Sequence, residues 1–94
     1  MRVSFNIPGP LRGFTENHST VELEVNDGAD VRKALQSLFA AYPGLRDRIL
    51  TESGEIRQHV NIFMGDENVR YTGGLTALLP VGAEVSIVPA ISGG

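Results

Sequence analysis

Residues 84–94 read EVSIVPAISGG and combine a strand pattern, a proline and two final glycines. Val85 and Ile87 alternate with residues that point the other way, which is typical of a strand with one buried face. Pro89 has no backbone N–H and cannot continue a sheet freely, so this strand is expected to end near Val88.

The residues that follow the strand are predicted to form a flexible tail, 90–94, on a folded domain that covers 1–89. Fully extended, the tail reaches at most about 17 Å. Gly93 and Gly94 carry no Cβ, so their backbone can lie against another protein or a nucleotide. A frayed terminus can contain two glycines as well, so the tail alone predicts no function.

The chain upstream of the last strand alternates between strand and helix signals. The runs RVSFNI (2–7) and TVELEV (20–25) predict two antiparallel strands joined by a long loop. Apolar residues at helical spacing predict a helix from Val31 to Tyr42, with Asp30 as its N-cap. A third strand is predicted in HVNIFM (59–64).

The order of these elements predicts the fold class. A short edge strand is expected at VRYT (69–72), before the last strand. One helix is then available to cover one face of a mixed sheet. The simplest closure places the last strand beside the first, and their long connection favours a parallel pair. The sequence therefore predicts an α+β domain with the β-grasp fold of ubiquitin.

Composition excludes several classes of function. The chain has 94 residues, a net charge of −3 and a single lysine, and no stretch of the sequence clusters its arginines. A nucleic-acid partner is not expected, because phosphate binding needs a basic face. No cysteine is present, and no apolar run approaches the ~20 residues of a membrane span. A cytoplasmic protein without a membrane partner is expected.

Other candidate sites are weak. No metal site is expected, because the two histidines, His18 and His59, have no cysteine to join them. No glycine-rich phosphate loop is present, and Gly73-Gly74 is interpreted as a structural bend. A solvated strand face and a turn account for the acidic pairs, Glu22/Glu24 and Asp66/Glu67.

The stretch HVNIFMGDENVRYTGGLTALLPVGAEVSIVPAISGG (59–94) carries a series of motifs in order. A V-N-I-aromatic strand, a D-x-x-V-R turn, a G-G-L loop and a V-x-I-x-P strand precede the Gly-Gly end. In these motifs the sequence resembles the ubiquitin-like sulfur carriers of the ThiS/MoaD family. It looks most like the CysO-like carriers of cysteine biosynthesis, and the likeness covers essentially the whole chain. Molybdopterin carriers often end in Val-Ala-Gly-Gly after Pro-Pro, whereas this chain has Pro89-Ala90-Ile91-Ser92.

The resemblance implies a covalent carrier that is not itself an enzyme and binds no cofactor. In this family an enzyme of the ubiquitin-activating type uses ATP and Mg²⁺ to adenylate the terminal carboxylate, here that of Gly94. Sulfur then displaces AMP and leaves a thiocarboxylate. Gly93, Ser92 and Ile91 are expected to be recognised with it. The implied acceptor is a pyridoxal-phosphate cysteine synthase, and a metallopeptidase would release the product.

Several alternatives stay open at this point. The chain could be the small subunit of molybdopterin synthase, or a sulfur donor for thiamine or secondary-metabolite synthesis. It could also be a protein modifier that forms an isopeptide bond through Gly94. A β-grasp binding module with an incidental tail is the last alternative.

A docking surface for partners is predicted next to the tail. Strand alternation sends Phe63 and Val88 to the face of the sheet opposite the helix, on strands that the fold makes neighbours. The two side chains are expected to lie side by side, as an apolar patch on an otherwise polar face. The alternative is that a loop, such as Pro8–Gly13, covers them.

Overall fold

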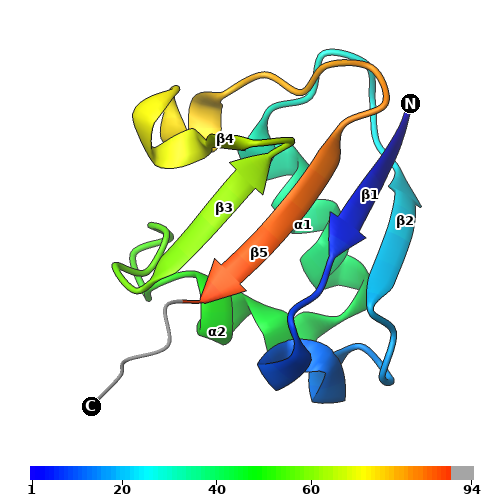
Figure 1. The fold of residues 1–94 in the computed structure, drawn as a ribbon, viewed down its shortest axis with the longest axis vertical. Helices are drawn as coiled ribbons and strands as arrows, with labels where there is room; N and C mark the ends of the chain where they lie inside the picture. The colour runs from blue at the N-terminus through cyan, green and yellow to red at the C-terminus, as the bar shows by residue number, and fades with distance from the viewer. Residues whose placement is uncertain (90–94) are drawn as a thin grey trace.

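The last strand, β5 (Glu84–Pro89), lies in the middle of a five-stranded sheet (Figure 1). The computed structural model describes residues 1–89. The strand order is β2-β1-β5-β3-β4. The other strands are β1 (Arg2–Asn6), β2 (Thr20–Glu24), β3 (Val60–Met64) and β4 (Glu67–Asn68).

Strand β5 joins the two halves of the sheet. It is parallel to β1, with Phe5 opposite Val85, and antiparallel to β3, with Ile62 opposite Ile87. The expected parallel closure of first and last strands is therefore confirmed. The alternation is also as expected, since Val85 and Ile87 are buried.

Helix α1 (Val31–Ala41) covers one face of the sheet (Figure 1). It begins at Asp30, whose Oδ1 accepts a hydrogen bond from Lys33 N at 2.9 Å, as an N-cap does. The helix ends just before Pro43, which opens a 3₁₀ turn, η2 (Pro43–Leu45). A second helix, α2 (Arg46–Ile49), follows.

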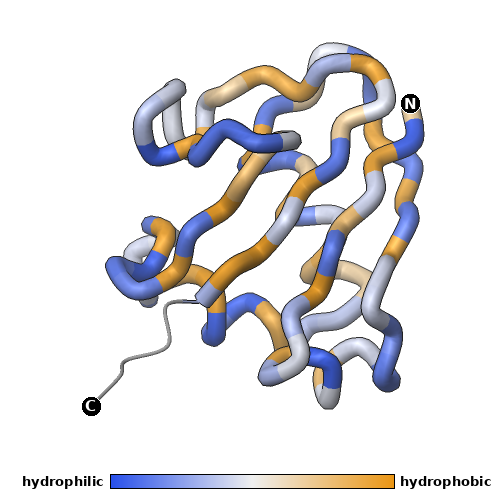
Figure 2. The backbone as a smooth tube through the Cα atoms, in the orientation of Figure 1, coloured by the Kyte–Doolittle hydropathy of each residue, from blue (hydrophilic) through white to orange (hydrophobic). Residues whose placement is uncertain are grey.

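The core lies between the sheet and the helices. Figure 2 shows apolar and polar residues alternating along the strands, as a sheet with one buried face requires. Side chains from both layers are almost fully buried, among them Phe5, Ile62, Ile87, Leu35, Leu38, Leu45 and Ile49. The core therefore packs the helices directly against β5, the strand that precedes residues 90–94.

The loop between β1 and β2 is more ordered than the sequence suggested. Residues Gly9–Phe14 form a 3₁₀ helix, η1, and Leu11 is buried in the core. Phe14 packs against Gly44, where an added Cβ would lie 2.8 Å from the ring. The guanidinium of Arg48 lies 5.0 Å from the centre of the same ring. The loop is thus fastened to the helical layer.

The predicted edge strand at 69–72 is wrong by two residues. The strand is β4, Glu67–Asn68, and Val69–Tyr71 forms a 3₁₀ turn, η3. Asn68 Oδ1 accepts a hydrogen bond from Arg70 N at 3.0 Å, which caps the turn and ends the strand. Burial of Val69 holds the turn against the sheet.

Gly73 and Gly74 form a bend, as interpreted from the sequence. Their φ angles are 118° and 59°, a region that side chains disfavour. A Cβ on Gly73 would lie 3.4 Å from backbone atoms of Ala77. The bend leads into η4 (Gly74–Thr76) and then to the segment that enters β5.

The N-cap of α1 gives a testable prediction. Asp30→Ala should lower the free energy of unfolding by about 1 kcal/mol, because Lys33 N loses its acceptor. Chemical denaturation measures the change. Asp66→Ala, at an exposed turn position, is the control and should change stability by no more than about 0.5 kcal/mol. Equal losses in the two variants would contradict the assigned cap.

Candidate functional site

The described part of the chain ends with β5 at Pro89, which is still paired with Val60 of β3; the predicted tail, 90–94, follows it. The strand is therefore one residue longer than the sequence suggested. The predicted site residues Ile91, Ser92, Gly93 and Gly94 lie outside the described residues. The structure accordingly fixes the point of departure of the tail and the surface around it.

Pro89 is tolerated at this position because no hydrogen bond of the β3–β5 ladder needs a donor from its backbone nitrogen. Gly65 N donates to Glu84 O at 3.0 Å, and hydrogen-bonded pairs then recur at every second residue of β5. By this alternation, the backbone N of Pro89 faces away from β3. The proline thus ends the strand without leaving a donor of β3 or β5 unpaired across the ladder.

Phe63 and Val88 share the open face of the sheet, but they are not directly opposite each other. Phe63 pairs with Ser86, and Val88 pairs with Asn61. The two apolar side chains are therefore diagonal neighbours, a spacing of roughly 7–8 Å between backbones. Val88 is 45% exposed and Phe63 is half-buried. Phe63 and Val88 therefore share one face of the sheet as expected, but they are further apart than two directly opposed residues would be.

Hydrogen-bonded polar side chains occupy much of the rest of this open face. They are Arg2 with Glu22 and Glu24 at 3.4 Å each, Asn6 with Glu84 and Ser86 at 2.9 Å each, and Asn68 with Asn61 at 3.1 Å. Phe63 and Val88 are therefore the apolar members of a mostly polar surface. The loop suggested as their cover, Pro8–Gly13, instead sends Leu11 into the core.

Two arginines that are far apart in sequence, Arg57 and Arg70, lie close to the start of β3, whose first residue pairs with Pro89. Arg70 Nη2 donates to Val60 O at 2.8 Å and to Arg57 O at 3.3 Å, which brings it to the start of β3. Arg57 Nε in turn donates to Asp47 O at 2.8 Å. Arg48 joins Arg57 in the lining of a shallow cavity there.

This cavity has a volume of about 310 Å³ and is lined by Asp47, Arg48, Arg57 and His59. Sequence reasoning missed it, because these residues are spread over 13 positions and no stretch contains a basic cluster. The hydrogen bonds of Arg57 and Arg70 to backbone carbonyls could not be inferred from the sequence. The cavity thus combines two arginines and a histidine with one carboxylate, next to the start of β3.

The histidines and carboxylates show no arrangement for metal binding within residues 1–89. His18 Nδ1 donates to Thr15 O at 2.9 Å, so it has an ordinary structural partner. Glu22 and Glu24 face Arg2. No helix in this part of the chain has the length and apolar character needed to cross a bilayer.

Comparison with known proteins adds evidence that geometry alone does not supply. The sequence profile of the ThiS family matches residues 5–94. The chain is 34% identical to the sulfur carrier protein CysO of Mycobacterium tuberculosis over 96 aligned residues, which cover 100% of both proteins. It is 39% identical to small archaeal modifier protein 3 of Haloferax volcanii over 70 residues, or 74% of this chain and 75% of that protein.

Solved structures agree with the fold. In the Amycolatopsis orientalis BexX/CysO complex, one chain matches with a TM-score of 0.87 and 32% identity, over 98% of this chain and 99% of that one. SAMP1 from Haloferax volcanii matches with a TM-score of 0.86 and 26% identity, over 100% of both chains. The β-grasp fold and the resemblance to ubiquitin-like carriers are confirmed. These relatives are named as carriers and modifiers, not as catalysts. By its match to the family profile and its full-length similarity to CysO, the chain belongs to the ThiS family.

Proposed function

We propose that this protein is a sulfur carrier for cysteine biosynthesis, with the α-carboxylate of Gly94 as its reactive group. The observation that carries the proposal is the full-length similarity to CysO, together with the Gly93-Gly94 end. The protein acts in this proposal as a cosubstrate: it is charged with sulfur by one enzyme and discharged by another. It contributes a terminus and a docking surface, and its partners contribute catalysis.

The chemistry starts from a carboxylate that is ionised at neutral pH, with an ordinary pKa of about 3.5, and is a poor electrophile. An oxygen of Gly94 attacks the α-phosphorus of ATP in the partner enzyme, and pyrophosphate leaves with Mg²⁺ assistance. Sulfide then attacks the acyl carbon, and AMP leaves. Where a persulfide attacks instead, the acyl disulfide that forms is cleaved by a second thiol, which leaves as a disulfide with the persulfide's former carrier. The product is a thiocarboxylate on Gly94, with one oxygen replaced by sulfur.

Adenylation of Gly94 in a partner's active site would need both a fixed strand before the tail and a narrow end. Strand β5 is held by β1 and β3, so Pro89 has a defined position. Five residues beyond it reach at most about 17 Å into a partner's active site. Glycines at the last two positions keep that end narrow. Ser92 and Ile91 would position the rest of the thread.

The partners proposed are three kinds of enzyme. The first is an adenylating enzyme of the ubiquitin-activating type, the second a pyridoxal-phosphate cysteine synthase, and the third a metallopeptidase that releases cysteine. The Amycolatopsis orientalis structure, a complex named for BexX and CysO, supports association of such a carrier with a partner. Phe63 and Val88 would contact these partners while the tail enters the active site.

A second candidate function is protein modification through an isopeptide bond to Gly94. It is favoured by the 39% identity to small archaeal modifier protein 3. Tagged protein expressed in cells distinguishes the two. A modifier would accumulate in covalent, high-mass conjugates, whereas a carrier would be recovered as the free chain with an altered terminus. The molybdopterin and thiamine pathways stay alternatives, and the identity of the acceptor enzyme decides between them.

Charging gives the first prediction for this function. Incubation with the cognate activating enzyme, ATP and a sulfur source should raise the intact mass by the difference between sulfur and oxygen. Tandem mass spectrometry should locate the change in the C-terminal peptide. The reaction without ATP is the control. An unchanged mass with a demonstrably active cognate enzyme would remove the basis of the carrier proposal.

The second prediction concerns the length and width of the tail. Deletion of Gly94, or Gly93→Val, should abolish charging, because the reactive carboxylate is displaced or the thread is widened and stiffened. The core described within residues 1–89 is complete without these positions, so the midpoint of thermal unfolding should stay within about 1 °C of the wild-type value. ATP–pyrophosphate exchange and thermal unfolding are measured together. Normal exchange by the truncated chain would contradict the proposed role of Gly94.

The third prediction tests the docking surface. Phe63→Asp and Val88→Asp should each weaken binding to the activating enzyme at least about tenfold, or roughly 1.4 kcal/mol, because an apolar contact becomes a buried charge. Val81→Asp is the matched control, since Val81 is 90% exposed and precedes the opposite end of β5. Calorimetric titration gives the affinities. Wild-type affinity in both docking variants would show that partners bind elsewhere.

A further inference from the structure

Strand β2 presents the longer free edge of the sheet within residues 1–89. It comes first in the strand order, and only β1 pairs with it there. The opposite edge is β4, which has two residues and turns at once into η3. A short strand that ends in a turn is a poor template for another chain, whereas a strand of five residues is a good one.

The register shows which backbone groups of β2 face outward. Ile7 N donates to Ser19 O at 2.8 Å, and Val25 N donates to Met1 O at 2.8 Å, so the odd-numbered residues of β2 face β1. In an antiparallel ladder the intervening residues then direct their N–H and C=O groups to the other side. Thr20, Glu22 and Glu24 therefore present donors and acceptors along the free edge.

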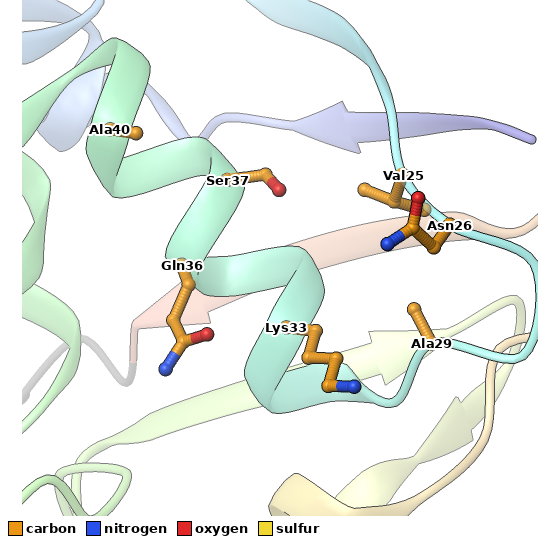
Figure 3. Close-up of a pocket in the computed structure, with 7 residues that line it drawn as sticks. All are labelled: Val25, Asn26, Ala29, Lys33, Gln36, Ser37 and Ala40. Atoms are coloured by element: carbon orange, nitrogen blue, oxygen red, sulfur yellow. The ribbon is translucent and has the colours of Figure 1, made fainter.

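A groove lies beside this edge, between the end of β2 and helix α1 (Figure 3). Its volume is about 300 Å³. Apolar side chains line part of it, and Lys33, Gln36 and Ser37 of α1 add polar groups; the apolar ones are Val25, Ala29 and Ala40. In Figure 3, Ser37 points from α1 toward Val25, and Lys33 extends toward Ala29.

The side chains of β2 itself differ on its two faces. Leu23, on the helix side, is only partly buried, although it packs against the core. On the open face, the side chains of Glu22 and Glu24 are 51% and 68% exposed. Arg2 lies 3.4 Å from one oxygen of each glutamate, and the N-terminal amine lies 3.6 Å from the other oxygen of Glu24. These pairings are long and exposed, so lone pairs of both carboxylates stay accessible to a further cation.

From this arrangement we propose that β2 and the adjoining groove bind an extended segment of a partner protein, which adds a sixth strand to the sheet. The segment alternates apolar side chains, which enter the groove beside Leu23 and Val25, with lysine or arginine side chains, which face Glu22 and Glu24. Backbone hydrogen bonds to the edge hold the segment, and the alternating side chains select it. The site is on the far side of β1 from β5, so it is separate from Pro89 and from Phe63 and Val88.

A second copy of this chain does not fit the same edge. Antiparallel pairing of two β2 strands would place the glutamates of one copy opposite those of the other. Like charges directly opposite each other across a pair of strands are destabilising. The charge of the edge therefore selects a basic partner segment and disfavours self-association.

The test titrates full-length protein with a synthetic peptide that alternates isoleucine and arginine, followed by backbone amide NMR. Chemical-shift changes should concentrate at 20–25 and 33–40, and the amides of Glu22 and Glu24 should become protected from exchange. The same peptide N-methylated at alternate amides should not bind, because it cannot pair with the edge. Changes confined to Phe63 and β5, or none at all, would overturn the proposal.

Variants separate charge from packing. The double variant Glu22→Lys/Glu24→Lys should bind the arginine peptide at least about tenfold more weakly and should gain affinity for an isoleucine–glutamate peptide. Asp66→Lys/Glu67→Lys carries the same change in net charge at the other edge and should bind like the wild type. Ser37→Phe, which fills the groove from a half-buried position, should weaken binding while the amide spectrum stays dispersed.

Two further results would count against the proposal. Equal weakening in both charge-reversed variants would mean that net charge alone attracts the peptide. Protection of Glu22 and Glu24 that rises with protein concentration, in the absence of peptide, would show that a second copy occupies the edge. Because none of these measurements involves charging of Gly94, they succeed or fail independently of the sulfur-carrier proposal.

Discussion

The pairing of β5 with both β1 and β3 is the constraint on which the rest of the structure depends. Val85 and Ile87 of this strand are buried, and its backbone is bonded on both edges. Without β5 the remaining strands form two separate pairs, β1 with β2 and β3 with β4. Neither pair alone could form a closed layer for α1 to cover. The strand that completes the fold is also the one that carries the tail.

This constraint gives the molecule two kinds of surface. Near the carboxyl end of β5, Arg70 bonds to the start of β3, and Phe63 and Val88 interrupt a polar face. At the edge formed by β2, two exposed glutamates lie beside unpaired backbone groups and a groove. A partner at the tail and a partner at β2 would occupy different strands. A carrier that must visit several enzymes would gain from a second surface that is not hidden when the tail is engaged.

Much of the fold could be predicted because it rests on short-range patterns. Alternation identified the buried faces of β1, β3 and β5, and Asp30 marked the start of α1. Prediction was less successful where a side chain competes with the backbone, as Asn68 does when it ends β4 and caps η3. The family motifs at the end of the sequence indicated the candidate site, but the structure describes only the strand that leads to it.

Features that depend on register or on distant residues could not be predicted in detail. The offset between Phe63 and Val88 is set by the register of β3 against β5. The connection between these strands is long, so no turn in the sequence indicates that register. The positions of the Arg57 and Arg70 side chains depend on hydrogen bonds to the carbonyls of Asp47 and Val60. The groove beside β2 depends on where α1 lies over the sheet, which periodicity does not specify.

The parallel pairing of β1 with β5 has a consequence for how the protein is made. The two strands are separated by almost the whole chain, so the loop between them is among the last to close and carries a large entropic cost. During synthesis, β1 and β2 emerge early but lack their central neighbour until residues 84–89 leave the ribosome. A chain interrupted before that point would present an unpaired β1 edge and would be a substrate for chaperones and proteases. Formation of the sheet and positioning of Pro89 are therefore a single step, because both wait for β5.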